Sequence, residues 1–492
     1  MGETTVLHTP PIDRQAAIED SYELSPMQLG MLYHTIESPQ PGMYCIVVCY
    51  RVKGRLDAQA LFDAWRTVVA RHPALRTSFH WQDRKAPVQV VHEHVMLPAV
   101  EHDWRELGAV DQHERLAALL ESENRRGFEL TTPPLMRLTL VRCADEIHEL
   151  IVAHHHLLLD GSCKPLLFGE VFAAYEAICH QKSVDLGRAE PYRRYIEWLR
   201  DQNLGEAERF WREELGGFKE PTPLWSASRV DTPPSRDYAE HQLLLDEQKT
   251  DELKKFARAN RLTLNTIACG AWALLLGHAN KRDDVVFGAT VNARPPTLDG
   301  VEAMLGLFIN TLPVRLPIST AIPLVEWLRK AQLRQSSARE YDFAPLSLIQ
   351  RWSDAPRGLP LFESIVVFEN NPGYGADSER HGSVEITDIR ALIRNSLPLT
   401  LRCVPGRTLS MQLLYDTRRF SPDTINHIAV QLVQLLNEMT SSGSASVARL
   451  MQSLDEVERH RTAQEANAFQ KAIRDKLSQR TREKRRSETS ES

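Results

Sequence analysis

Hydrophobic positions in the first part of the chain recur at two alternating spacings, one helical and one extended. In residues 24–33, Ser25 and Pro26 are suited to a first helical turn, and apolar residues follow at helical intervals. Residues 44–52 form a run dense in β-branched side chains, which predicts a strand, and residues 61–70 again share one apolar helical face. Helices and strands that alternate in this way predict an α/β layer architecture.

One apolar run of this first half ends in titratable side chains. A strand predicted at 135–140 is separated by a hairpin-sized gap, 142–147, from a segment that begins with His148 and Glu149 and continues with apolar and β-branched residues from 150. The histidines at 154–156 close that run, and Asp160 and Gly161 follow at a turn. Titratable groups therefore gather where a buried strand opens into a loop, which is where chemistry is usually placed.

The second half of the chain repeats the order of the first, although no internal sequence repeat is visible. A proline-rich stretch at 219–237 predicts a linker after a long polar helical stretch at 192–218. We expect lobes at 21–218 and 238–455, preceded by a leader at 1–20. In the second lobe the pattern predicts helices at 249–260, 263–278 and 421–439, and strands at 238–245, 284–291, 305–315, 363–369, 383–390, 398–404 and 408–415.

The side chains at the end of the apolar run suit acid–base chemistry near neutral pH. The imidazole of His155 or His156 can accept a proton there, and Asp160 can orient a ring or neutralise a cation that braces the loop. Gly161 would let a backbone N–H approach a substrate closely. A cluster of satisfied core side chains, or an adventitious metal site, is the alternative interpretation.

Composition and charge narrow the class of protein. A chain of 492 residues with 42% hydrophobic and 25% charged residues is an ordinary globular protein of two or three domains. A net charge of −6 argues against nucleic-acid binding by phosphate neutralisation. Residues 1–14 have no apolar core of a secretory signal, and the most apolar stretch, 267–277, is shorter than the roughly 20 residues that cross a bilayer. We therefore expect a cytoplasmic protein without membrane or nucleic-acid contacts.

Three other features each have a structural and a functional interpretation. The seven cysteines include no CxxC pair, so neither disulfides nor a zinc site is indicated, and Cys163 near Asp160 lacks a second base that would make it a nucleophile. The arginines and histidine of 71–76 could bind an anion, although a buried arginine that ties a helix end to a sheet is preferred. The basic tail, 456–492, predicts a solvated, fraying helix or a dock for an acidic partner.

Seven segments, in chain order, resemble the sequence motifs of the condensation domains of nonribosomal peptide synthetases. The string His155-His156-x-x-x-Asp160-Gly161 is similar to the HHxxxDG signature of the acyltransferase superfamily that includes these domains and chloramphenicol acetyltransferase. The other six segments are 24–28, 71–79, 192–198, 305–315, 341–346 and 394–399, and the resemblance covers roughly residues 20–450.

The resemblance implies a V-shaped pair of chloramphenicol-acetyltransferase-like lobes with the active site at their junction, reached by a tunnel from either side. A carrier protein would present an acyl or peptidyl thioester on a phosphopantetheine arm at one mouth. An amine, or sometimes an alcohol, either a small molecule or carrier-bound, would enter at the other. The chain itself would bind no cofactor and no metal, because the arm arrives on the partner, and we expect it to act as a monomer.

The resemblance also implies roles for single residues. His156 matches the histidine that accepts a proton from the nucleophile or holds and orients it, and His155 precedes it in the motif. Asp160 would be structural and pair with an arginine across the site, for which we expect Arg294. Gly161 would keep the donor thioester channel clear.

Other positions of the expected site are ambiguous or depart from the family pattern. Asn310 would line the cleft, and the sequence leaves open whether its amide is a functional donor or a satisfied buried group. Ser162 stands where a bulky Trp or Val is often seen and Cys163 where a Ser is, so we expect an altered tunnel wall. Residues 292–294, Asn-Ala-Arg, differ from the more usual small-Gly-Arg.

No adenylation or carrier domain is recognisable, which predicts a free-standing enzyme or an excised piece of a larger one.

The leading functional prediction is a carrier-dependent acyltransferase that forms an amide or an ester. The segment 305–315 is more similar to peptide-bond-forming members than to epimerisation domains, and paired aspartates typical of heterocyclisation domains are absent from the motif. An acyl-CoA-dependent transferase and a non-catalytic recruitment domain are the alternatives. A recruitment domain would be expected to lose His156, which is present here.

Overall fold

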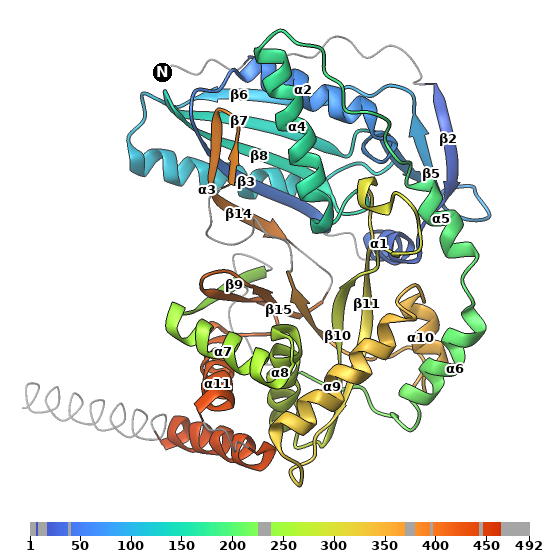
Figure 1. The fold of residues 1–492 in the computed structure, drawn as a ribbon, viewed down its shortest axis with the longest axis vertical. Helices are drawn as coiled ribbons and strands as arrows, with labels where there is room; N and C mark the ends of the chain where they lie inside the picture. Colours follow the sequence, from blue (N-terminus) through green and yellow to red (C-terminus); the bar gives the residue numbers. More distant parts are fainter. Residues whose placement is uncertain are drawn as a thin grey trace, which may run out of the picture.

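The computed structural model describes residues 6–7, 17–37, 41–224, 238–369, 379–393, 397–441 and 446–463. They form two lobes, each built on a β-sheet, that lie one above the other in Figure 1. Most of the expected leader, residues 225–237 of the linker, 394–396 of the last motif and the tail beyond 463 lie outside the described residues. The two-lobe α/β fold expected from the sequence is confirmed.

The first lobe is a seven-stranded sheet with helices on both faces. Its elements are β1 (Val6–Leu7), β3 (Cys45–Lys53), β6 (Ala99–Asp103), β7 (Met136–Ala144), β8 (Ile147–His155), α2 (Ala58–Arg71), α3 (Ala109–Arg126) and α4 (Lys164–Cys179), together with β13 (Glu379–His381) and β14 (Val384–Ile393). The order is β1-β6-β7-β8-β3-β14-β13. Because strand side chains alternate, Ile46 and Val48 of β3 pack with α2 and α4, whereas Val47 and Cys49 pack with α3.

Strands β13 and β14 come from the second half of the chain and join the sheet of the first lobe. Figure 1 shows them in orange beside the blue β3. β14 pairs antiparallel with β3, with Ile389 opposite Tyr50. The expected second lobe at 238–455 therefore needs a correction at 379–393. Strand periodicity shows that a segment is extended, but it does not show which sheet the segment joins.

The second lobe is a six-stranded sheet with the order β11-β10-β12-β15-β16-β9. Its elements are β9 (Tyr238–Leu245), β10 (Asp284–Asn292), β11 (Ile309–Pro317), β12 (Ser364–Phe368), β15 (Leu399–Val404), β16 (Leu409–Asp416), α7 (Glu247–Asn260), α8 (Leu264–Asn280), α9 (Leu324–Arg339) and α11 (Pro422–Ser441). One face, with Phe287, Leu401 and Met411, packs on α7, α8 and α11. α8 is apolar nearly all round because it is buried at the centre of this core.

The predicted long helix at 192–218 is two helices, α5 (Arg193–Arg200) and α6 (Leu204–Glu214). The break follows from Asn203, whose Oδ1 accepts hydrogen bonds from the N–H groups of Gly205 at 3.1 Å and Glu206 at 3.2 Å and so caps the second helix. α6 then packs with α10 (Leu346–Trp352) over part of the second sheet's other face, through Trp211 and Ile349.

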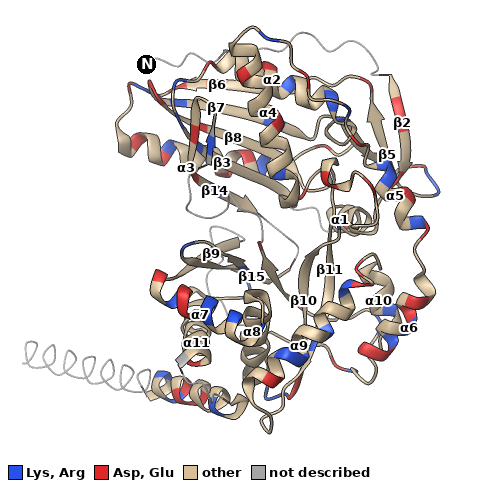
Figure 2. Cartoon of the chain, viewed as in Figure 1, with Lys and Arg blue, Asp and Glu red and all other residues tan. Residues whose placement is uncertain are grey.

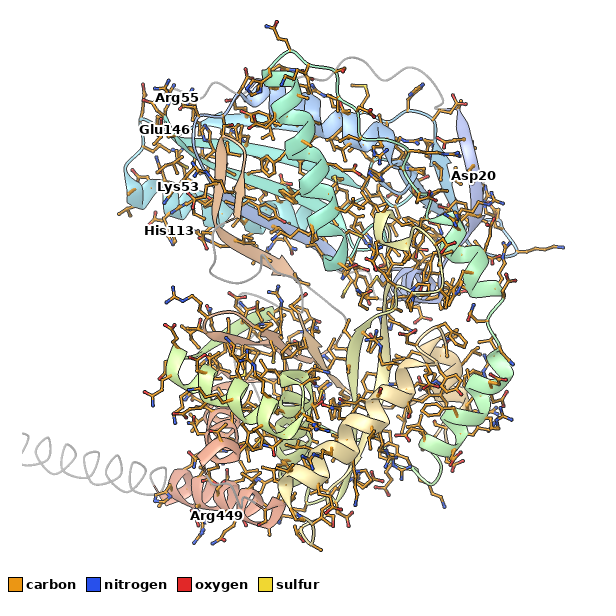
Figure 3. All side chains as sticks on the ribbon, viewed as in Figure 1. Asp20, Lys53, Arg55, His113, Glu146 and Arg449 are labelled. Carbon is orange, nitrogen blue, oxygen red and sulfur yellow. The ribbon has the colours of Figure 1, made fainter. Side chains whose placement is uncertain are left out.

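Acidic and basic side chains are interspersed over α6, α7 and α9 (Figure 2). Arg55 and Glu146, labelled in Figure 3, form one exposed pair, with Arg55 Nε 3.3 Å from Glu146 Oε1. Such exposed pairs contribute little to stability. Among the described helices, none is by itself long and apolar enough to cross a membrane; α7 and α8 meet that length and composition only as a pair, which is bent by 103°.

Gly306 lies in close contact with Tyr192, and we expect Gly306→Ala to destabilise the fold. A Cβ at this position would come within 2.1 Å of Tyr192 Cδ2, and the buried Tyr192 ring is anchored by a 2.6 Å hydrogen bond from its hydroxyl to the Leu307 carbonyl. The expected loss in free energy of unfolding is about 1–3 kcal/mol, the usual cost of overpacking. Urea unfolding measures it.

Gly169, an exposed residue inside α4, is the matched control. Nothing lies within 4 Å of a Cβ added there, so Gly169→Ala should raise the free energy of unfolding by about 0.5–1 kcal/mol through helix propensity. Equal changes for the two variants would contradict the packing argument.

Candidate active site at the junction of the lobes

The end of β8 is held in place by strand pairing on both sides. β8 pairs with β3 and with β7, and its last residue, His155, lies opposite Cys45. The pairing extends one residue further, because the His156 N–H donates to the Tyr44 carbonyl at 2.9 Å. His155 and His156 are therefore positioned by the sheet, and the chain turns away only after them.

His156 presents one ring nitrogen to a cavity between the lobes. Its Nδ1 lies 2.8 Å from the carbonyl oxygen of Leu159. A carbonyl only accepts hydrogen bonds, so Nδ1 carries the proton in the neutral ring and Nε2 keeps a lone pair. The ring lines the cavity, and Nε2 has no hydrogen-bond partner among the described residues. This is the arrangement of a group that can accept a proton from a bound nucleophile.

His155 has a different environment. Its side chain is buried, and its Nδ1 accepts a hydrogen bond from the Leu157 N–H at 3.2 Å. Burial, with a smaller contribution from neighbouring His156, lowers the pKa of His155 to about 3. His155 is thus neutral near pH 7 and braces the turn. Of the two histidines expected to take a proton, the geometry favours His156.

Asp160 joins the loop that follows His156, called the histidine loop below, to the second lobe. Its Oδ1 accepts from the backbone N–H of Ser162 at 2.8 Å and from the Ser162 hydroxyl at 2.5 Å. Its Oδ2 accepts from the backbone N–H of Phe308 at 2.5 Å; Phe308 directly precedes β11 of the second lobe, and its side chain packs in the core of the first lobe. The carboxylate is buried and starts the short 3-10 turn Gly161–Cys163. These contacts would suit the structural role expected for Asp160, which stays a prediction.

Arg294 does not pair directly with Asp160, and this expectation was wrong. The Arg294 Nε donates instead to the Ser162 hydroxyl at 3.0 Å, and that hydroxyl in turn donates to Asp160. The guanidinium also donates to the carbonyl groups of Val301 and Met304 and lies 3.9 Å from the centre of the Phe308 ring. A serine at 162 is small enough to fit between the two charges, so the departure from a bulky residue inserts a hydroxyl bridge.

Asn310 is a buried amide whose oxygen and nitrogen both have partners within the protein. Its Nδ2 donates to the carbonyl groups of Asp342 at 2.7 Å and Ala344 at 2.9 Å, and its Oδ1 accepts from the Thr311 N–H at 2.8 Å. It lies at the cavity wall, as expected for a cleft residue, but its amide groups are used to hold the 342–344 loop against β11.

The cavity has a volume of about 1210 Å³ and is bounded by both lobes. From the first lobe, α1 (Pro26–Glu37) and His156, Asp160, Gly161 and Ser162 form its wall, and from the second lobe β10, β11, α9 and the face of the sheet turned away from α8 do so. A space of this size exceeds the usual 300–1,000 Å³ of a small-molecule pocket. It has room for an extended substrate arm beside a second reactant.

One support of the histidine loop was not foreseen from the sequence. Ser25 and Gln28 form a reciprocal cap of α1: the Ser25 N–H donates to Gln28 Oε1 at 2.9 Å, and the Gln28 N–H donates to Ser25 Oγ at 3.2 Å. The Gln28 Nε2 then donates to the Leu157 carbonyl at 2.9 Å. The Ser-x-x-Gln spacing signals the cap, but nothing in it signals the contact with a loop 129 residues away.

The other candidates have structural roles. Cys163 is buried, its Sγ contacts the Gly306 carbonyl at 3.1 Å, and burial raises its thiol pKa to about 12, so it is no nucleophile near pH 7. Arg71 and His72 both contact Glu170 of α4, so this motif ties a helix to its neighbour. In the part of the chain that the structure describes, no group of three or more His, Cys, Asp or Glu residues could hold a metal ion.

The chain belongs to the condensation-domain family, the acyltransferases that form amide bonds in nonribosomal peptide synthesis, because the family model "Condensation domain" matches residues 18–461. A linear gramicidin synthase protein of Brevibacillus parabrevis is 40% identical over 459 residues, which are 93% of this chain and 9% of that protein. Bacitracin synthase 3 of Bacillus licheniformis is 31% identical over 442 residues, 89% of this chain and 7% of the synthase. The chain thus spans only a small part of these relatives.

Solved structures share the fold. The starter condensation domain of rhizomide synthetase has a TM-score of 0.75 at 18% identity, covering 87% of this chain and 96% of that one. The X-domain from teicoplanin biosynthesis has a TM-score of 0.73 at 22% identity, covering 89% and 98%. At these identities the likeness shows the two-lobe fold alone, so the chemistry of this chain depends on its own site.

Proposed function

We propose that this chain transfers an acyl or peptidyl group from a carrier-protein phosphopantetheine thioester to an amine, forming an amide. The observation that carries the proposal is His156: its Nδ1 is bound to the Leu159 carbonyl, and its ring lines a cavity shared by both lobes, which leaves Nε2 for a bound nucleophile. A thioester is already activated, so the protein mainly has to position a nucleophile beside a proton acceptor.

In the proposed step the nitrogen lone pair of the acceptor forms a bond to the thioester carbonyl carbon. His156 Nε2 accepts a proton from that nitrogen or holds its N–H in line with the carbonyl. The C–S bond then breaks, and the sulfur leaves with the bonding electrons. The departing sulfur takes up the proton that the nitrogen has lost, so the products are an amide and a free carrier thiol.

The neighbouring residues position this reaction. Asp160 and Ser162 fix the loop that follows His156 against the second lobe, and Arg294 neutralises the buried carboxylate through the Ser162 hydroxyl. Gly161 lies at the cavity wall, where the absence of a side chain leaves room for the thioester. The partners are acyl or peptidyl carrier proteins, which supply the phosphopantetheine arm, and the acceptor is carrier-bound or a free small molecule. We place this activity in the cytoplasm and assign it to a monomer.

The proposal is tested by turnover with matched donors. A panel of acyl groups is loaded onto carrier proteins encoded beside this chain and offered with amine acceptors, and the same acyl groups are offered as coenzyme A thioesters. Mass spectrometry should detect amide product with the carrier-bound donors at a much higher rate than with coenzyme A. Equal rates would favour an acyl-CoA-dependent transferase, and no product with any donor would favour a recruitment domain. Hydroxyl acceptors in the same assay test for ester formation.

A further inference from the structure

One residue in the cavity wall has no side chain, although it lies inside a helix. Gly30 is in the second turn of α1, is exposed and lines the cavity. Met27 and Tyr33, three residues before and after it, line the cavity as well. Side chains three residues apart are neighbours on a helix surface, so the three positions form one row. This row has a gap at its middle position, which is called the Gly30 notch below.

Neither the backbone nor the packing of the chain requires a glycine at this position. Gly30 is helical and has no positive φ, and in a helix interior glycine is less favourable than every other residue except proline. A Cβ added at Gly30 would meet no described residue within 4 Å. Gly270 of α8 is the opposite case, since a Cβ there would lie 2.5 Å from Leu328 Cδ2. What Gly30 leaves free is therefore space in the cavity.

The helix that carries the Gly30 notch also contacts the histidine loop. The Gln28 Nε2 of α1 donates to the Leu157 carbonyl at 2.9 Å, and Gln28 is two residues before Gly30. Positions two residues apart face nearly opposite sides of a helix, so α1 holds the loop on one side and presents the notch on the other. Gly30 and His156 line the same cavity. The notch and the proton acceptor are thus both parts of one substrate space.

The surroundings of the Gly30 notch suit an apolar group. α1 lies beside β11 of the second lobe (Figure 1), and Ile309 of that strand lines the cavity, as does Met27 of α1. His34, one turn beyond Gly30, is a polar neighbour, and its Nδ1 lies 2.9 Å from the Tyr44 hydroxyl, so this nitrogen already has a partner. Transfer of an apolar group from water to such a wall is favourable.

We propose that the Gly30 notch receives an apolar side chain of one of the two reactants, and that Gly30 thereby sets the largest side chain that the site accepts. The inference rests on the proposed function and names a residue that determines its substrate range. A side chain at position 30 would project into the notch. A hydrophobic pocket discriminates by about 10- to 200-fold for one methylene group, so the effect of such a side chain is measurable. Gly30 takes no part in the chemical step.

The test measures binding, which does not depend on turnover. Two series of unreactive pantetheine amides carry glycyl, leucyl or phenylalanyl groups; the free-amine series stands for the acceptor and the N-acetyl series for the donor. Each compound is titrated by calorimetry into wild type, Gly30→Ala and Gly30→Leu. In the series that occupies the notch, wild type should bind the leucyl and phenylalanyl compounds more tightly than the glycyl compound. Gly30→Leu should weaken binding of these two by at least about tenfold and leave the glycyl compound unchanged, and Gly30→Ala should show a smaller loss of the same kind.

Gly169 of α4 provides the matched control. It too is an exposed helical glycine with no described residue within 4 Å of an added Cβ, but it is not part of the cavity wall. Gly30→Ala and Gly169→Ala should both raise the melting temperature, because alanine is favoured over glycine in a helix. Only the substitution at position 30 should change binding. A rise in melting temperature together with a selective loss of binding cannot result from unfolding.

Two outcomes would overturn the inference: an equal loss of the glycyl and phenylalanyl compounds in Gly30→Leu, or no loss in either series. If Gly30→Leu does not fold, Gly30→Ala decides the test by the same selective loss. Failure of the proposed function appears separately, because wild type would then yield no amide from carrier-bound donors, whatever its preference among these compounds.

Discussion

Replacing His156 by alanine is expected to lower the rate of amide formation by about 100- to 10,000-fold, the range typical for loss of a group that transfers a proton. The fold should persist, because the side chain is partly exposed and its ring makes one hydrogen bond, to the Leu159 carbonyl, among the described residues. The measurement is kcat with a saturating carrier-bound donor, followed by mass spectrometry of the product, with the melting temperature as a check on folding.

A second variant separates the two roles open to His156. His156→Gln keeps a side chain that can hold an N–H group but cannot take up a proton. A rate close to that of alanine would show that proton transfer matters, and a rate close to wild type would show that orientation matters. His180→Ala, at an exposed histidine of the first lobe, should leave the rate unchanged. Product formation at the wild-type rate by His156→Ala would require another base or a binding role for the chain.

The order of elements followed from periodicity wherever an element carries its own pattern. The predicted strand at 238–245 matches β9, and the predicted helix at 263–278 matches α8 to within two residues. The pattern did not predict β2 (Ile18–Glu23) or β5 (Val88–His92), which form a three-stranded sheet with β4 (Thr77–His80) and are short. It also missed the sheet to which β14 belongs, because the pairing of a strand depends on residues that are far away in the sequence.

The candidate site, like the fold, was predictable only where its residues form a local pattern in the sequence. The motif located the histidine loop, because a strand that ends in polar side chains is visible in the sequence. It did not show that the Asp160 carboxylate reaches Phe308, 148 residues away, or that the Ser162 hydroxyl lies between Asp160 and Arg294. The contacts of Asp160 with Phe308 and of Ser162 with Arg294 join segments that are far apart in the chain, so no local pattern reveals them. A local segment of the sequence thus identifies the residue that can accept a proton, but it does not reveal the contacts that position this residue.

Asp160→Ala is expected to reduce both stability and activity, because the Asp160 carboxylate holds the loop that follows His156 in place. The substitution leaves the backbone N–H of Phe308 without its acceptor at a buried position and that of Ser162 without its acceptor at a half-buried one. A buried donor left unsatisfied costs about 1–3 kcal/mol, so the free energy of unfolding should fall by about 1–3 kcal/mol for Phe308, with a smaller further loss at Ser162. Because the histidine loop also loses its attachment to the second lobe, we expect kcat to fall at least about 100-fold, in line with the effect of small misplacements. Urea unfolding and the turnover assay measure the two effects.

Asp57→Ala provides the comparison, because Asp57 is also an aspartate at the start of a helical segment. Its carboxylate caps α2 by accepting from the Ala60 N–H at 2.9 Å, on an exposed part of the first lobe. Loss of such a cap costs about 1 kcal/mol and should leave kcat unchanged. Asp160→Asn is the sharper variant: its amide oxygen can replace only one carboxylate oxygen, and the NH₂ group then faces either the Phe308 N–H or the Ser162 N–H. If Asp160→Ala lost no more stability than Asp57→Ala and kept its kcat, the carboxylate would not be what holds the histidine loop to the second lobe.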